Sequence, residues 1–232
     1  MDYRMEGQAA YVLHSRPYRD TSLLVDFFTL EHGKCSAVVQ GARRPNSRLR
    51  ATIQPFVPLQ IGWRGRQDLK TMSGAEPVGQ MLFLTGSALI CGLYVNELLE
   101  RVLQPFEPHP KLFVYYQYVL TELAAAQDIE GALRTFEHRL LGEMGYGLDL
   151  DRIDPAGHYR YRAGQGLVPL GRPPQKPDMY YFTGNQLQAI GQDHYASAEV
   201  RRAAKRLMRL AIEQLLGDKP LRSRELFLKL KE

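Results

Sequence analysis

The sequence is poor in the residues that build disulfide frameworks and cysteine-rich metal sites. Its 232 residues include two cysteines, Cys35 and Cys91, and one tryptophan. Two cysteines are too few for the framework of a small secreted protein or for a four-cysteine zinc site, and they fit a reducing cytoplasm. Because free cysteines are mostly buried, we predict that both lie in the core.

Long hydrophobic runs are also missing. The N-terminal segment MDYRMEGQ is polar and has no apolar core, so we predict no signal peptide. The most apolar stretch, Met81 to Val95, is interrupted by small and polar residues and is too short to span a bilayer.

Familiar catalytic signatures are absent. The chain contains no GxxxxGK[ST] phosphate loop, no GxGxxG after a strand and no GxSxG elbow. Asp149, Asp151 and Asp154 alternate as in part of a calcium loop, but the glycine and the closing glutamate of that loop are missing. His158 and His194 lack metal-ligand spacing. We therefore expect no enzyme activity, no cofactor and no metal.

Positive charge is concentrated in the first third of the chain. Residues 1–80 carry 11 Lys and Arg against 7 Asp and Glu, whereas the remaining residues carry 19 against 18. The densest stretch, Gly41 to Ala51 (GARRPNSRLRA), has four arginines, no acid and several turn-forming residues. Arginine stays charged and binds phosphate through paired hydrogen bonds, so this loop suits a polyanion. An ordinary solvated surface loop has the same composition.

Short β-branched and aromatic runs between turn residues predict five strands, at residues 9–14, 22–29, 35–40, 56–64 and 69–75. No helical pattern in this region would cover a flat sheet, which favours a closed five-stranded barrel. A barrel of the OB type binds oligonucleotides on one face and through its loops. Other small barrels match the pattern equally well. Tyr18, Phe56 and Trp63 are candidates for stacking on bases, although barrel core is the simpler interpretation of Phe56.

The period becomes helical from about residue 80. Helices are predicted at residues 82–103, 111–126, 130–144, from about 183, 197–216 and 223–231. Residues 149–178 are rich in proline and form an irregular insertion with a possible hairpin of 158–162 and 167–170. The predicted class is α+β, with a barrel at residues 1–79 and a helical domain at 80–232. Glu97, within the first helix, is expected to have a structural role as a cap or in a pair, because a buried carboxylate needs a partner.

In sequence order, several segments resemble the RecO family of bacterial recombination mediators. The resemblance covers nearly the whole chain and is carried by GARR, QPFVPL and KTMSGAEP, and later by GYGLDLD and KPLRSRELF. It implies an OB-fold followed by a helical domain in a cytoplasmic, nucleoid-associated protein without membrane association. It also implies binding to single- and double-stranded DNA and annealing of complementary strands. The implied partners are RecR and the acidic C-terminal tail of the single-stranded DNA-binding protein, with a functional link to RecA and RecF.

The chain departs from many RecO proteins after GYGLDLD. Those members place four zinc-ligand cysteines there, whereas this chain continues with Arg152-Ile153-Asp154 and has no cysteine. We therefore predict that no zinc is bound.

Annealing requires contacts to phosphate that leave the bases free. The candidates for these contacts in the barrel are Lys34, Arg43, Arg44, Arg48, Arg50, Arg64, Arg66 and Lys70. A second candidate patch comprises Arg201, Arg202, Lys205, Arg206, Arg222 and Arg224. For its helical part, Ser197 to Leu216, the ordinary solvated face of an amphipathic helix is the simpler interpretation.

A partner peptide that ends in a hydrophobic residue and a carboxylate needs an apolar pocket rimmed by cations. The predicted third helix supplies the candidates Arg134, Phe136, Arg139, Leu140 and Met144. Core packing explains the apolar members of this set equally well. Two other functions remain open, an adaptor whose barrel binds an acidic protein surface and an RNA-binding barrel protein without annealing activity.

Overall fold

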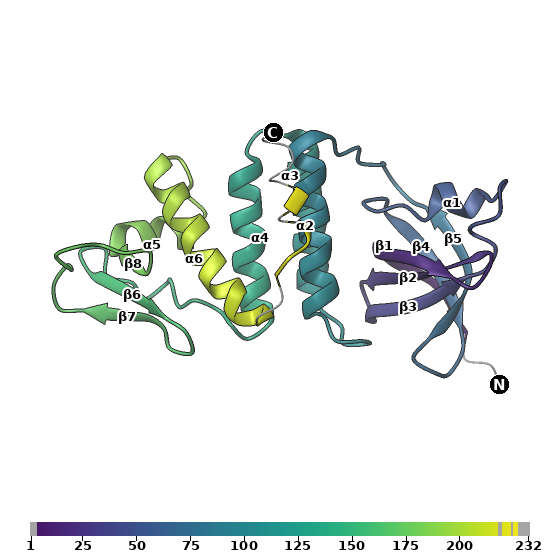
Figure 1. Ribbon diagram of the computed structural model, residues 1–232, viewed down its shortest axis with the longest axis horizontal. Coiled ribbons are helices and arrows are strands. Elements are labelled where there is room, and N and C mark those ends of the chain that lie inside the picture. Colours follow the sequence, from purple (N-terminus) through teal and green to yellow (C-terminus); the bar gives the residue numbers. More distant parts are fainter. Residues whose placement is uncertain (1–3, 218–219, 224, 227–232) are drawn as a thin grey trace. The chain divides into compact units, whose positions relative to one another are not determined.

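The computed structural model describes residues 4–217, 220–223 and 225–226 (Figure 1). These residues divide into two compact units. The first comprises the described residues up to Ala126 together with those from Pro220 onward, and the second comprises the described residues from Gln127 to Gly217. The boundary after residue 79 suggested by the sequence lies inside the first unit. Among the described residues, no helix is long and apolar enough to cross a membrane.

The first unit begins with the predicted closed barrel, which is confirmed. Its strands are β1 (Arg4–Tyr18), β2 (Ser22–Thr29), β3 (Gly33–Val39), β4 (Leu59–Arg64) and β5 (Lys70–Pro77), in the order β1-β2-β3-β5-β4. The β3–β5 pair is parallel, and the other neighbours are antiparallel. Alternate residues of each strand point into the barrel, as Val25 and Phe27 do in β2.

Several local predictions need correction. β1 is longer than predicted because its pairing with β2 continues to Tyr18. The basic loop is not loop throughout, since it ends in the short helix α1 (Arg48–Thr52). β4 begins later than predicted, because Phe56 adopts a left-handed conformation with φ of 68°. Phe56 and Trp63 are only 5% and 1% exposed, so both belong to the core and present no face to a base.

Two helices cover one half of the outer barrel wall. They are α2 (Gly86–Val102) and α3 (Pro110–Ala125). Cys35 of β3 and Cys91 of α2 are both buried, as predicted. The Phe113 ring of α3 lies 5.6 Å from the Tyr11 ring of β1 and 5.2 Å from the Phe28 ring of β2. Tyr116 contacts the same two barrel rings edge-on. Aromatic pairs in this arrangement bury large apolar areas with defined geometry.

A buried amide fixes α2 to the barrel. The register of β1 with β2 shifts between Val12 and His14, which makes Leu13 an extra residue. Asn96 of α2 donates its amide to the carbonyls of Val12 and Leu13, at 3.1 Å in each case. Its own side-chain oxygen accepts the Tyr116 hydroxyl at 2.7 Å. This network satisfies the carbonyls of the bulge and ties both helices to β1.

The segment between α2 and α3 docks on the turn between β2 and β3. The Lys34 carbonyl accepts the Phe106 amide at 2.9 Å, and the Lys34 Nζ donates to the Glu100 carbonyl at 2.7 Å. At Gly33, where φ is 63°, a Cβ would lie 1.8 Å from the Glu107 carbonyl oxygen. Only glycine fits this close approach.

Glu97 joins the C-terminal segment to α2, as its position in the helix suggested. Its two carboxylate oxygens accept the backbone amides of Arg222 and Ser223, each at 2.8 Å, and the Arg101 guanidinium lies 2.7 Å away. Burial alone would raise the pKa of Glu97, but the hydrogen bonds from Ser223 and Arg222 and the Arg101 charge outweigh it and lower the pKa. The rest of the predicted helix at 223–231 lies mostly outside the described residues.

The second unit contains α4 (Ile129–Glu143), α5 (Gly184–Gly191) and α6 (Ala198–Leu216). The predicted hairpin of the insertion is present as β6 (His158–Arg162) and β7 (Gly166–Leu170). A third strand, β8 (Tyr181–Thr183), joins it in the order β7-β6-β8 and was not predicted, because three residues carry too short a pattern. The Thr183 hydroxyl and the Gln186 side chain form a capping box that starts α5.

We expect Asn96→Ala to lower the free energy of unfolding by about 3 kcal/mol, because it leaves two buried carbonyls and the Tyr116 hydroxyl without their partner. Urea denaturation measures the change. Asn46→Ala is the matched control, since Asn46 is exposed in a turn of the same unit. If both variants lose the same small amount, the buried amide does not hold the helices on the barrel.

Candidate nucleic-acid interface

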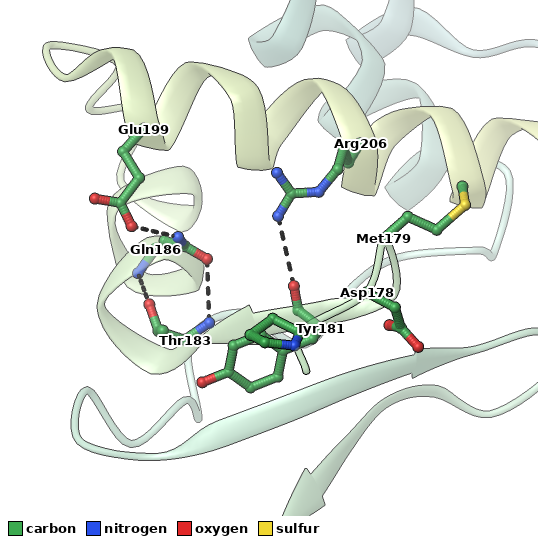
Figure 2. A pocket seen from close by; sticks show the side chains of 8 residues that line it. Asp178, Met179, Tyr181, Thr183, Gln186, Glu199 and Arg206 are labelled. Atoms are coloured by element: carbon green, nitrogen blue, oxygen red, sulfur yellow. Dashed lines mark hydrogen bonds between the residues drawn. The ribbon is translucent and has the colours of Figure 1, made fainter. Parts of the chain in front are cut away.

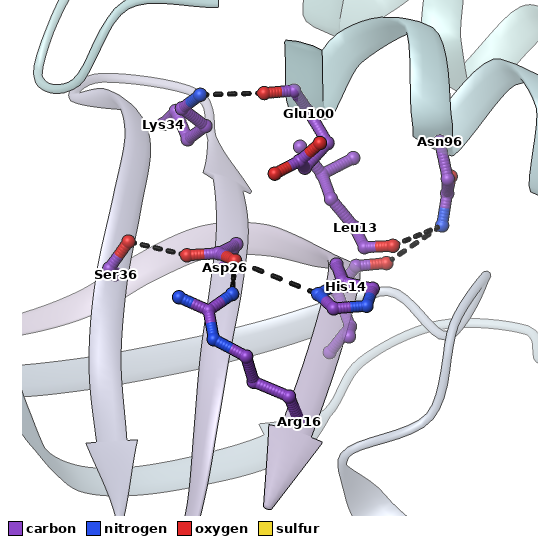
Figure 3. A network of polar contacts seen from close by, with 9 residues as sticks. Leu13, His14, Arg16, Asp26, Lys34, Ser36, Asn96 and Glu100 are labelled. Atoms are coloured by element: carbon purple, nitrogen blue, oxygen red, sulfur yellow. Dashed lines mark hydrogen bonds and ion pairs between the residues drawn. The ribbon is translucent and has the colours of Figure 1, made fainter. Parts of the chain in front are cut away.

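The outer wall of the barrel changes character from one end to the other. Residues directly opposite one another on neighbouring strands share a face, so the register defines rows around the wall. The row of Tyr11, Phe28 and Lys34 lies under α2 and α3. The next row is polar and is shown in Figure 3. The uncovered part of the wall is therefore separated from the helix-covered part by one row of side chains.

The polar row centres on Asp26 (Figure 3). This residue is 5% exposed, and its carboxylate accepts the Arg16 guanidinium at 3.1 Å and the Ser36 hydroxyl. The His14 Nδ1 lies 3.9 Å from the same carboxylate. A carboxylate with so little exposure needs such partners. In return, Asp26 holds Arg16 against the strand face.

The row beyond crosses all five strands and ends in arginines on both sides. The cross-strand pairs run from Arg16 through Leu24, Val38 and Thr71 to Arg64. The middle residues are half-buried and both arginines are exposed. Arg64 is followed by the β4–β5 turn, which contains Arg66. The end of β3, where the basic loop begins, is two strand spacings away, or roughly 10 Å.

The basic loop is packed on its own unit rather than detached from it. Leu49 of α1 lies against the barrel core, and α1 contacts β5. The arginines on either side of Leu49, Arg48 and Arg50, are exposed, as is Arg44. The barrel therefore presents the loop cations on a supported segment.

The turn between β1 and β2 lies beside this loop. The Arg43 amide donates to the Thr21 carbonyl at 2.9 Å, and the Arg43 Nη1 donates to the Arg19 carbonyl at 3.1 Å. Arg19 therefore lies next to Arg43 of the loop, and Arg16 lies three residues before Arg19 on β1. The sequence did not identify Arg16 and Arg19 as candidates, because they lie in a polar break between two strands.

We call this surface the basic end. All its members are exposed, and they are Arg16, Arg19, Arg43, Arg44, Arg48, Arg50, Arg64 and Arg66. Arg16 is paired with Asp26, and two exposed carboxylates, Asp20 and Asp68, lie in the same turns, so eight arginines are opposed by three acids. The basic end therefore keeps a large positive excess, and its guanidinium groups suit a phosphate backbone.

Two lysines predicted to contact phosphate are engaged inside the protein. Lys34 is bound to the C-terminal carbonyl of α2 described above. Lys70 is 7% exposed, donates to the Gln67 carbonyl at 2.7 Å and lies 4.6 Å from the Phe106 ring centroid. We therefore leave both out of the basic end.

Some cations of α6 are paired with acids, and others are exposed. Arg201 forms a bidentate pair with Asp128, at 2.5 and 2.9 Å, which lowers the pKa of that carboxyl. Arg209 donates to Glu213 at 2.9 Å. Arg202 and Lys205 are exposed.

Arg206, Arg222 and Arg224 are the remaining members of the second patch. The Arg206 guanidinium carbon lies 5.2 Å from the Phe182 ring centroid. Arg222 is exposed, and Arg224 lies outside the described residues. Among the described residues, three members of the second patch are exposed, Arg202, Lys205 and Arg222, against eight at the basic end.

The α4 residues predicted for a partner peptide are largely internal. Phe136 and Leu140 have no exposed surface, and Met144 is half-buried. Arg134 donates to Glu137 at 2.7 Å, and Arg139 donates to Asp193 at the same distance. The apolar members therefore pack in the core, and a peptide would need them to rearrange.

A cavity of about 460 Å³ opens in the second unit beside α6, β8 and the start of α5 (Figure 2). Three charged side chains line it, and each has a partner within the protein. Asp178 accepts Arg160 at 2.5 Å, Glu199 accepts Gln186 at 2.6 Å, and Arg206 donates to the Tyr181 carbonyl at 3.5 Å. Asp178 and Glu199 are thus paired with other side chains, whereas Arg206 contacts a carbonyl and its buried Nε has no hydrogen-bond partner. Within the described residues, no group of three or more His, Cys, Asp or Glu is placed to hold a metal ion.

Comparison with known proteins gives a consistent result over most of the chain. The family model described as "Recombination protein O N terminal" matches residues 3–81, and that described as "Recombination protein O C terminal" matches residues 84–153. The DNA repair protein RecO of Vibrio parahaemolyticus is 42% identical over 228 residues, which cover 95% of this chain and 92% of that protein. The RecO of Yersinia enterocolitica is 44% identical over 232 residues, with 96% and 95% covered. That of Actinobacillus pleuropneumoniae is 43% identical over 225 residues, with 94% and 92% covered.

We expect the triple reversal Arg44→Glu, Arg48→Glu, Arg50→Glu to weaken binding of a single-stranded oligonucleotide by at least about 100-fold at low salt, because three attractive phosphate contacts become repulsive. Fluorescence anisotropy with labelled oligothymidylate measures the affinity. The control reverses three exposed cations of the second unit, Arg162, Arg172 and Lys176, and so makes the same change in net charge. Equal losses in both variants would mean that net charge, rather than the basic end, determines binding.

Proposed function

This chain belongs to the RecO family of DNA repair proteins, and we propose that it is a DNA-binding recombination mediator that anneals complementary single strands. The observation that carries the proposal is the basic end, which gathers eight exposed arginines on the uncovered part of an OB-type barrel. Barrels of this type bind oligonucleotides on this face and through the adjoining loops.

Annealing is an electrostatic task in this proposal. Two complementary strands repel each other through their phosphates, and a surface that binds both backbones offsets the repulsion. Guanidinium groups contact phosphate without occupying the pairing edges of the bases, so the bases stay free to find their complement. This chemistry needs no nucleophile, nucleotide or metal. It also predicts binding to both single- and double-stranded DNA, with affinity that falls steeply as salt rises.

The helix-covered part of the barrel wall also supports this proposal, because it removes aromatic rings from the surface. Tyr11 and Phe28 would otherwise present an apolar strand face to bases, but α3 occupies that face. Phe56 and Trp63, which the sequence suggested for stacking, are buried and so cannot stack on a base either. A surface with many cations and few exposed rings favours contacts to phosphate over extended base stacking.

We further propose that the protein works with partners at DNA in the nucleoid. In this proposal it binds RecR and the acidic C-terminal tail of the single-stranded DNA-binding protein, and with RecR and RecF it helps to load RecA onto coated single strands. The support is family membership together with an architecture that leaves the second unit for protein contacts. The α4 residues proposed for the tail keep Arg134, Arg139 and Met144 partly exposed.

We expect the protein to accelerate annealing of complementary oligonucleotides coated with the cognate single-stranded DNA-binding protein. A salt series from about 50 to 300 mM should abolish the acceleration, since phosphate contacts are lost as counterions compete. Fluorescence quenching between labelled strands reports the rate, with a chelator present and no nucleotide added. Retained tail binding without acceleration would favour an adaptor, and a preference for RNA of equal length would favour an RNA-binding protein.

For the tail peptide, we expect Arg139→Ala to weaken binding several-fold, because the partly exposed guanidinium is the proposed contact for the peptide carboxylates. Isothermal calorimetry with the synthetic tail measures the affinity. Arg134→Ala is less suitable, since Arg134 pairs with the buried Glu137 and its loss would lower stability as well. An unchanged affinity in Arg139→Ala, with the fold intact, would remove α4 from the proposed contact.

A further inference from the structure

Among the four loop arginines, Arg43 differs from the others in what it contacts. Its side-chain Nη1 donates to two carbonyls of the β1–β2 turn, that of Arg19 at 3.1 Å and that of Asp20 at 3.3 Å. Its backbone amide donates to the next carbonyl, Thr21, at 2.9 Å. Three consecutive carbonyls of the turn are therefore held by one residue of the loop.

The turn that Arg43 holds has an unfavourable backbone conformation. Arg19 has a φ of 51°, in the left-handed region that residues with a Cβ rarely adopt. Such conformations persist where surrounding contacts hold them, and they are concentrated at functional sites. Here the contacts come from Arg43.

The turn presents a stacked pair of side chains. The Arg19 guanidinium carbon lies 5.3 Å from the centroid of the Tyr18 ring. Arg19 is exposed and Tyr18 is half-buried at the end of β1. A guanidinium supported by an aromatic ring is flat and ordered, and unpaired bases stack on guanidinium planes as they do on aromatic rings. The same group keeps its charge for a neighbouring phosphate.

We propose that Tyr18 and Arg19 form a contact for an unpaired nucleobase and its phosphate, and that Arg43 is a positioning residue that acts through this turn. The inference rests on the proposed DNA binding at the basic end, and it assigns different roles to the loop arginines. Arg44, Arg48 and Arg50 contact phosphate directly. Arg43 keeps the β1–β2 turn in the conformation that exposes the stacked pair.

A double-mutant cycle tests the coupling. Arg19→Ala is expected to weaken binding of an oligothymidylate of about 15 nucleotides roughly tenfold, the size of one stacking contact. Arg43→Ala should give a similar loss, and the double variant should be no more than about twofold weaker than either single variant. Arg44→Ala is the matched control, and its loss should multiply with that of Arg19→Ala. Independent, multiplying losses for Arg43 and Arg19 would overturn the proposal.

Charge-preserving variants separate positioning from direct contact. Lysine at position 43 keeps the charge but lacks the guanidinium fork that reaches both carbonyls, so Arg43→Lys should behave like Arg43→Ala. Arg44→Lys should retain most of its affinity, because a lysine still contacts phosphate. An Arg43→Lys variant with full affinity would show that Arg43 acts as a phosphate contact. Thermal unfolding of each variant verifies that the barrel is intact.

An abasic oligonucleotide tests the stacking itself. Arg19→Lys should weaken binding of oligothymidylate several-fold and leave the affinity for an abasic strand of equal length unchanged, since only the former offers a base to the guanidinium plane. Equal losses of affinity on both strands would show that Arg19 contacts phosphate rather than a base, and would overturn the proposed stacking. If the wild-type protein bound neither strand, the proposed DNA binding would fail as well, which the other outcomes do not imply.

Discussion

The structure of the first unit depends on one buried polar contact, the amide of Asn96 on the bulge of β1. Its hydrogen bonds to Val12 and Leu13 place α2 on the barrel, and the Tyr116 hydroxyl places α3 beside it. The contact is specific because the bulge offers two neighbouring carbonyls that the regular ladder would have paired. With the helices in this position the aromatic face of β1 and β2 is covered, whereas the arginines at the opposite end of the wall stay exposed.

The distribution of charge follows that division. Lys34, a cation near the helix-covered part of the wall, donates its Nζ to a carbonyl in the last turn of α2. Cations at the uncovered end stay exposed, and the polar row around Asp26 lies between the two regions. An exposed cationic surface with few exposed rings suits the proposed function, in which two strands are held through their phosphates with the bases left free. The proposed DNA binding therefore depends on the basic end.

Much of the fold was predictable from local patterns, and much of the site was not. The strand at 22–29 was predicted to the residue, because alternation and bounding turn residues are strong local signals. The basic loop was likewise visible in the sequence. Composition could not show that Lys70 is buried or that Arg19 lies beside the loop, since these facts depend on contacts between segments that are distant in the sequence. The core role of Phe136 was an open alternative for the same reason.

Hydrogen–deuterium exchange with and without a single-stranded oligonucleotide is the measurement that shows whether DNA binds at the basic end. Amides that a bound strand shields exchange more slowly, and the segments concerned are read from peptide fragments. The account predicts protection in three segments of the barrel, residues 16–22, 41–52 and 64–70, and little change in α6. Protection confined to residues 198–209, with the three barrel segments unchanged, would contradict it and move the DNA-binding surface to the second unit.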